Sequence, residues 1–157
     1  MKQIINCDTK SKNTFNPSEC KVLIIENCTA TNKIVRQYFL HKQYQVLSVF
    51  TLEEAYTILN SDVVIDYVIL DINLPDGNSY ELIKNISQNH TKFFILTTEN
   101  DSTLNEYSYK NGVIDFIVKD KYFIHKIQQL APTIEQFENN KDKTILIVDD
   151  SFVLQQQ

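Results

Sequence analysis

The residues of this chain best suited to chemistry are polar side chains that directly follow short apolar runs. Asp71 follows residues 67–70, an unbroken apolar run, and Pro75 and Gly77 come shortly after it. Such a run is typical of a central parallel strand that is covered on both faces. Asp71 is therefore expected at the carboxyl edge of a sheet, where it would serve as a nucleophile, a metal ligand or a turn residue.

Other apolar runs also end in polar residues. Glu26 and Asn27 follow residues 21–25, Thr97 ends a run that starts at Lys92, and Lys119 ends a later one. In a parallel sheet these strand ends meet in one crevice. Carboxylate and amide oxygens suit Mg²⁺, a hydroxyl and a lysine suit phosphoryl oxygens, and a carboxylate can attack phosphorus. The combination indicates phosphoryl transfer to a carboxylate.

Five short apolar strands alternating with helical patterns predict a parallel sheet with helices on both faces. Right-handed crossovers favour a flavodoxin-like, doubly wound α/β fold with strand order 2-1-3-4-5. The expected strands are 21–25, 45–50, 67–71, 92–97 and 113–118. Helices are expected over 31–41 and 101–109. A second helix, capped by Thr51 with Glu54, is expected to end near Ser61, and a third to begin at Asn78 or Ser79. The last helix begins near Lys121, and Pro132 is expected to kink it or end its regular part.

Composition narrows the classes of function. The 157 residues carry a net charge of −5 and no basic stripe, so no nucleic-acid partner is expected. No apolar run is long enough to span a membrane, so no membrane partner is expected either. Cys7, Cys20 and Cys28 lack metal-ligand spacing and suit free thiols in a reducing cytoplasm. Only two glycines occur, which excludes glycine-rich phosphate loops.

With these residues in place, residues 21–138 resemble a receiver domain of a bacterial two-component response regulator. The resemblance implies that Asp71 is the phosphoacceptor and that Lys119 pairs with the phosphoryl group. It also implies that Thr97 and Phe116 are the switch residues. The metal ligands that it implies for Mg²⁺ are Glu26, Asn27, Asp71 and the backbone carbonyl of Asn73.

The chain departs from the family pattern at three places. Asn27 stands where the family usually has a metal-binding aspartate, beside Glu26, and this predicts weak Mg²⁺ binding. Asp120 follows Lys119 where the family has proline, and a cis bond without proline costs about 3 kcal/mol. Thr98 stands where a small residue is common, which would narrow access to the acceptor.

The flanking segments suggest a longer architecture. Residues 1–20 are expected to form an amino-terminal extension, and residues 139–143 a linker. Residues 143–151 repeat the pattern of residues 21–27, now with an acidic pair, so 144–157 resemble the start of a second receiver. By analogy this predicts a tandem-receiver protein, whose output is often a diguanylate cyclase.

The leading hypothesis is a phosphorylation-dependent switch. A histidine kinase or phosphotransfer protein would donate to Asp71, and the output would lie downstream in the same protein. The alternative is a degenerate pseudo-receiver that acts as a phosphorylation-independent interaction module, for instance in a homodimer. An Asp-nucleophile phosphatase is disfavoured because Asn73 cannot serve as its general acid. The receiver itself is therefore not expected to be an enzyme, and a flavin site is excluded by the loop after residue 25.

Overall fold

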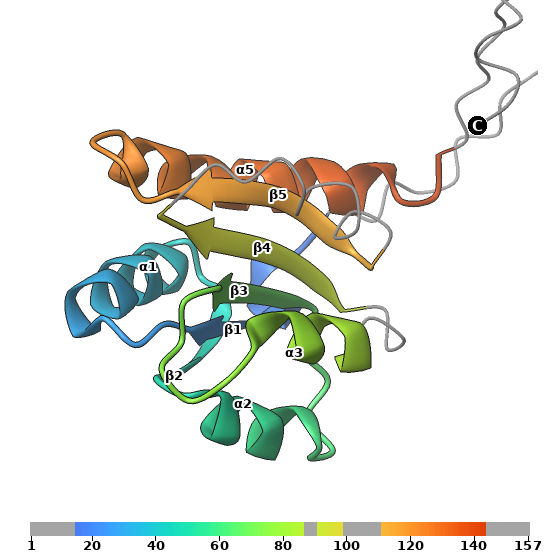
Figure 1. Cartoon of the computed structure of the whole chain (residues 1–157). Helices are drawn as coiled ribbons and strands as arrows, with labels where there is room; N and C mark the ends of the chain where they lie inside the picture. The colour runs from blue at the N-terminus through green and yellow to red at the C-terminus, as the bar shows by residue number, and fades with distance from the viewer. Residues whose placement is uncertain (1–14, 87–90, 99–110, 144–157) are drawn as a thin grey trace, which may run out of the picture.

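The computed structural model describes residues 15–86, 91–98 and 111–143 (Figure 1). Its elements in chain order are the 3-10 helix η1 (Pro17–Glu19), β1 (Lys21–Ile25), α1 (Thr29–His41), β2 (Gln45–Val49), α2 (Leu52–Leu59), β3 (Tyr67–Asp71), α3 (Ser79–Ile86), β4 (Lys92–Thr97), β5 (Val113–Val118) and α5 (Phe123–Asn140). The helix expected over 101–109 and the strand expected after residue 143 lie outside the described residues.

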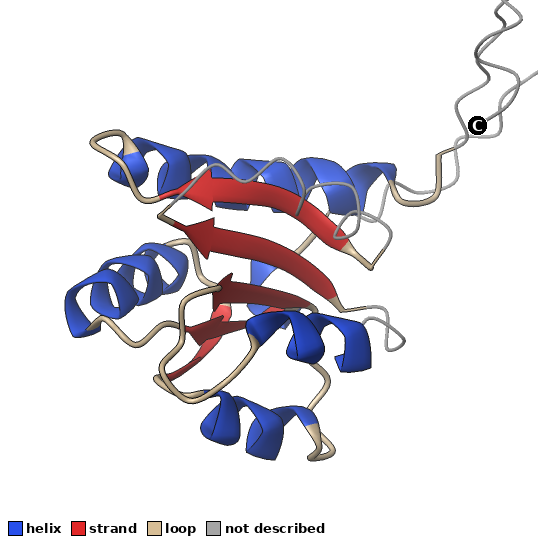
Figure 2. Ribbon diagram, in the orientation of Figure 1, coloured by secondary structure: helices blue, strands red, loops and turns tan. Residues whose placement is uncertain are grey.

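The strands form a five-stranded sheet in the order β2-β1-β3-β4-β5, and every neighbouring pair is parallel (Figure 2). This confirms the predicted flavodoxin-like topology. β1 and β3 are adjacent, with Ile25 opposite Leu70, and β4 continues the sheet with Leu96 opposite Asp71. The polar residues that follow these strands therefore come out at one edge.

Helices cover both faces of the sheet, and this explains why its central strands are so uniformly apolar. Every residue of β3 is buried. On one face α1 and α5 pack against alternate strand residues through Phe39 and Ile127. On the other face α2 and α3 contribute Ala55 and Leu82. Strands covered on both faces cannot alternate polar and apolar residues, so they appear in the sequence as continuous apolar runs.

Most element ends agree with the sequence pattern, and the differences are local. β2 ends one residue early, at Val49, and α1 begins two residues early, at Thr29. The predicted cap of α2 is present, since Thr51 Oγ1 accepts a hydrogen bond from Glu54 N at 3.2 Å. The Glu54 carboxylate returns to Phe50 N at 2.8 Å instead of to the cap residue itself.

Pro132 does not end α5, which continues to Asn140. A proline removes the N–H that would bond the carbonyl four residues earlier, here Gln128. Tyr38 of α1 supplies a replacement donor, because its hydroxyl lies 2.7 Å from Gln128 O. Of the two effects expected of Pro132, a kink or an end of the regular helix, the second is wrong, because α5 continues and the replacement donor comes from α1.

The far end of α5 is fixed to the beginning of β3. The Tyr67 hydroxyl donates to Glu138 Oε1 at 2.6 Å, and Lys92 lies over the Phe137 ring at 5.8 Å. α5 thus runs back from the carboxyl edge of the sheet to its amino edge (Figure 1). Its last two residues, 139 and 140, belong to the stretch expected as linker. Within the described ranges, no helix is both long and apolar enough to cross a membrane.

Candidate functional site

A lysine and two acids meet at the carboxyl edge of the sheet. Lys119 Nζ, just beyond β5, lies 2.6 Å from Asp71 Oδ2 at the end of β3 and 2.6 Å from Glu26 Oε2 just beyond β1. The Glu26 side chain is fully buried, and that of Asp71 is 4% exposed. Parallel topology brings these strand ends together, as the sequence predicted.

Burial and charge act in opposite directions on these groups. Burial raises the pKa of Glu26, because desolvation penalises the carboxylate more than Lys119 stabilises it. Burial also disfavours the Lys119 ammonium, but its contacts with the Asp71 and Glu26 carboxylates outweigh this and raise its pKa. Glu26 Oε2 is in ion-pair contact with Lys119 without an aligned hydrogen bond. Lys119 thus pairs with two buried acids. When both acids are ionised, the negative charge of this cluster exceeds its positive charge.

The loop after β1 is held so that Glu26 points inward. Glu26 Oε1 accepts from Cys28 N at 2.9 Å. The amide of Asn32, which is 2% exposed, donates to Glu26 O at 3.0 Å and to Val49 O at 3.2 Å. Asn32 therefore joins the ends of β1 and β2. Asn32 was not predicted as a site residue, although it is a polar side chain on the apolar stripe of α1.

Asp71 is fixed by its own loop. Its Oδ1 accepts from Asn73 N at 3.0 Å, and its backbone carbonyl accepts from the hydroxyl of the fully buried Ser79 at 3.0 Å. Asn73 itself is exposed, and its amide donates to Thr98 Oγ1 at 3.3 Å. Thr98 thus forms a polar link across the edge between β3 and β4.

The two expected switch residues lie on β4 and β5. Thr97 is 6% exposed, and its carbonyl accepts from Lys119 N at 2.7 Å, which joins the ends of β4 and β5. Phe116 is half-buried and packs against the apolar cluster that α2 and α3 share with the sheet. Thr97 therefore lies at the carboxyl edge beside Lys119, and Phe116 lies three residues before Lys119 on β5.

The other two departures from the family pattern can also be placed. Asn27 is exposed, whereas the neighbouring Glu26 is fully buried. The peptide bond between Lys119 and Asp120 is trans, as are all those of the described residues. Asp120 instead starts a turn, where it accepts from Tyr122 N at 2.9 Å and pairs with Lys126 at 2.9 Å.

Comparison with known proteins agrees with this geometry. The family model for the response regulator receiver domain matches residues 22–130, which is most of the chain. The chain belongs to this family. Two-component signalling is therefore its general setting, and receiver domains generally bind Mg²⁺ at the phosphorylation site.

Curated relatives are larger than this receiver. The response regulator SaeR of Staphylococcus epidermidis is 31% identical over 100 residues, which cover 62% of this chain and 43% of SaeR. The transcriptional regulatory protein CrdR of Helicobacter pylori is 25% identical over 123 residues, 76% of this chain and 55% of CrdR. The chain thus spans about half the length of these relatives.

Solved structures share the fold of this receiver. The chemotaxis response regulator CheY4 of Vibrio cholerae matches with a TM-score of 0.64 at 19% identity, covering 73% of this chain and 98% of CheY4. A CheY-like receiver domain protein of Methanospirillum hungatei matches with a TM-score of 0.67 at 19% identity, covering 78% of this chain and 98% of that one. At such identity the likeness concerns the fold alone.

Proposed function

We propose that this receiver accepts a phosphoryl group on Asp71 from a phosphohistidine of a kinase or phosphotransfer protein. The observation that carries the proposal is the 2.6 Å contact between Lys119 Nζ and Asp71 Oδ2 at the carboxyl edge of the sheet. A buried carboxylate beside a lysine can attack phosphorus while the lysine neutralises the phosphoryl oxygens.

The transfer exchanges one bond for another. A carboxylate oxygen of Asp71 forms the new bond to phosphorus, and the bond from phosphorus to the imidazole nitrogen of the donor breaks. The leaving imidazole keeps the electron pair and takes up a proton. Lys119 leaves its pairing with the Asp71 carboxylate and pairs with the phosphoryl group instead. The Thr97 hydroxyl donates a hydrogen bond to a phosphoryl oxygen.

The oxygen donors near Asp71 fit a magnesium ion. Asp71 and the Asn73 carbonyl offer hard oxygen ligands, and Glu26 Oε2 is a buried oxygen without an aligned hydrogen bond. The amide of the exposed Asn27 would add a neutral oxygen if it turned towards the ion. Mg²⁺ bound there would supply positive charge against the phosphoryl oxygens. Asn27 brings no charge to this set, so the affinity is expected to be low.

The downstream effect is also a proposal. When Thr97 turns towards the phosphoryl group, it leaves space beside β5 that the half-buried Phe116 side chain can enter. This movement would change the surface around β5 and α5, to which an output domain responds. By analogy with the curated relatives, which continue well beyond the matched part, we place the output in a domain other than the receiver.

The proposal is tested with the whole chain, acetyl phosphate and Mg²⁺, read by intact mass spectrometry. A single phosphoryl addition that requires Mg²⁺ is the expected result. The second candidate function, a phosphorylation-independent interaction module, is favoured by the neutral Asn27 and predicts no addition at any Mg²⁺ concentration.

Asn27→Asp should tighten Mg²⁺ binding and speed labelling by acetyl phosphate. One added charge near the divalent ion is worth on the order of 1–3 kcal/mol at a surface-like dielectric, which is about one to two decades in affinity. Isothermal titration measures the affinity, and Asn27→Gln, which keeps the charge unchanged, is the matched control. Equal affinity of the unmodified protein and Asn27→Asp would mean that Glu26 already supplies the missing charge.

A further inference from the structure

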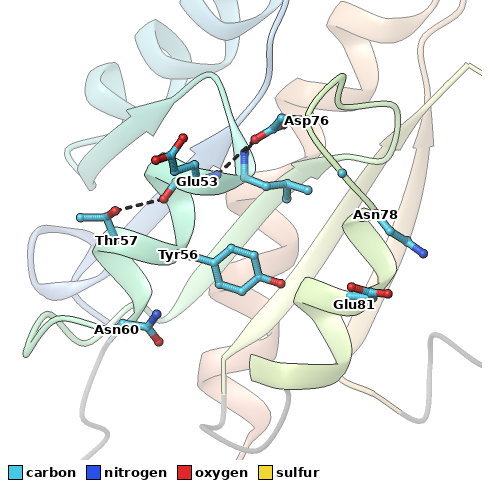
Figure 3. A pocket seen from close by; sticks show the side chains of 9 residues that line it. Glu53, Tyr56, Thr57, Asn60, Asp76, Asn78 and Glu81 are labelled. Atoms are coloured by element: carbon cyan, nitrogen blue, oxygen red, sulfur yellow. Dashed lines mark hydrogen bonds between the residues drawn. The ribbon is translucent and has the colours of Figure 1, made fainter.

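A carboxylate outside the crevice ties the loop after β3 to helix α2. Asp76 Oδ2 accepts from Leu52 N at 2.7 Å and from Glu53 N at 3.2 Å (Figure 3). These are N–H groups of the first turn of α2, which have no partner within the helix. A negative charge at a helix N-terminus is also favourable. Asp76 lies 24 residues from Leu52 along the chain, so the contact joins two separate segments.

α2 has a complete local cap without Asp76. Thr51 Oγ1 accepts from Glu54 N, and Glu54 in turn accepts from Phe50 N. The Asp76 contact therefore does more than begin the helix, since it also holds the loop on α2. Gly77 brings the same loop close to Leu52, because a Cβ at Gly77 would lie 2.9 Å from Leu52 Cδ1. A groove of about 570 Å³ between α2 and α3 begins at this contact (Figure 3).

The contact closes a ring of bonds around the crevice. On one side the loop held by Asp76 also contains Asn73, whose N–H bonds Asp71. On the other side α2 follows β2, and Val49 O at the end of β2 accepts from Glu26 N at 3.2 Å. Lys119 completes the ring between Glu26 and Asp71. α2 thus connects the loop that bonds Asp71 with the end of β2 that bonds Glu26.

We propose that Asp76 is a positioning residue, which acts through α2 to hold Asp71 and the Asn73 carbonyl in place opposite Glu26. The role in Mg²⁺ binding and phosphorylation rests on the proposed function, whereas the effect on the loop does not. Asp76 touches neither the ion nor the phosphoryl group. Its contribution is to prevent the loop from moving away from the crevice.

The experiment compares Asp76→Ala with Thr51→Ala in the full chain. Both variants remove a cap of α2, but only Asp76→Ala frees the loop, so Thr51→Ala is the matched control for stability. Asp76→Ala should raise the Mg²⁺ dissociation constant about tenfold and slow acetyl phosphate labelling about tenfold. This is the low end of the loss that is typical when a residue that orients a metal ligand is removed. Thr51→Ala should leave both within about twofold. Asp76→Asn, whose amide oxygen still accepts from α2, should recover most of the loss.

A second readout follows the loop directly. Amide hydrogen exchange at Asn73 should be faster in Asp76→Ala than in Thr51→Ala, with or without Mg²⁺. Equal exchange in the two variants overturns the proposal, and so do equal Mg²⁺ affinities where the ion binds. If the unmodified protein neither binds Mg²⁺ nor is labelled, the proposed function fails, and the exchange comparison still decides whether Asp76 positions the loop.

Discussion

Asp71→Asn should abolish labelling of this receiver by acetyl phosphate in the presence of Mg²⁺. The amide is a poor nucleophile, and it also loses a charge that Mg²⁺ needs. Its shape matches the carboxylate, and its oxygen can still accept from Asn73 N, so the fold should remain, whereas the bond that Asp71 Oδ2 accepts from Lys119 is lost. Intact mass spectrometry then shows no phosphoryl addition, while circular dichroism is unchanged.

The matched control for this result is Asp66→Asn. Asp66 precedes the opposite end of β3 and accepts from Lys21 N at 2.8 Å, a bond that an amide oxygen keeps. Asp66→Asn should be labelled at the rate of the unmodified protein. A phosphoryl addition on Asp71→Asn would place the acceptor at another residue and contradict the site as assigned.

Lys119→Met should be the most destabilising single change in the crevice. It leaves Glu26 and Asp71 buried without a cation, and breaking a buried ion pair from one side typically costs about 3–5 kcal/mol. Urea unfolding at neutral pH measures the loss. Lys126→Met is the control, because the Lys126–Asp120 pair is half-exposed and such surface pairs contribute about 0–1 kcal/mol.

The loss in Lys119→Met should depend on pH. The pKa of Glu26 is already raised by burial, and removing the lysine raises it further. A carboxyl group with a raised pKa in the folded state favours folding below its unfolded pKa, and this contribution disappears as pH rises through the folded pKa. The variant should therefore be closest to the unmodified protein in acid and furthest from it at neutral pH. Adding Glu26→Gln should restore part of the stability, and no restoration would mean that Glu26 is not the unpaired charge.

The sequence predicted the sheet well because each strand is a local pattern. β4 and β5 have the expected bounds, since both are apolar runs with clear polar or glycine boundaries. The meeting of Asp71 with Lys119 also followed, because parallel order alone brings those strand ends together. No side-chain geometry was needed for either conclusion.

The details that the sequence did not predict depend on side-chain direction and on loops. Glu26 was predicted as a metal ligand, which stays a prediction, but its full burial and its contact with Lys119 were not predicted. The contact between Asp76 and α2 requires the conformation of the loop after β3, which no local pattern specifies. Pro132 was expected to kink α5 or end its regular part, yet the helix continues to Asn140. The carbonyl that Pro132 leaves without its usual donor accepts from Tyr38, which comes from a distant part of the chain.

The hydrogen bond between Tyr67 and Glu138 determines at which edge of the sheet α5 ends, and therefore where a following domain would begin. An α-helix of 18 residues is about 27 Å long, so α5 carries the chain from the side of Lys119 to the side of Tyr67. Anything joined after Asn140 starts at that distant side. The phosphate donor of the proposed function can therefore approach Asp71 without competing with such a neighbour for space. A change at the Asp71 edge reaches a neighbour at the far edge through the domain itself. If α5 tilts as one unit near Lys126, its other end at Glu138 moves as well.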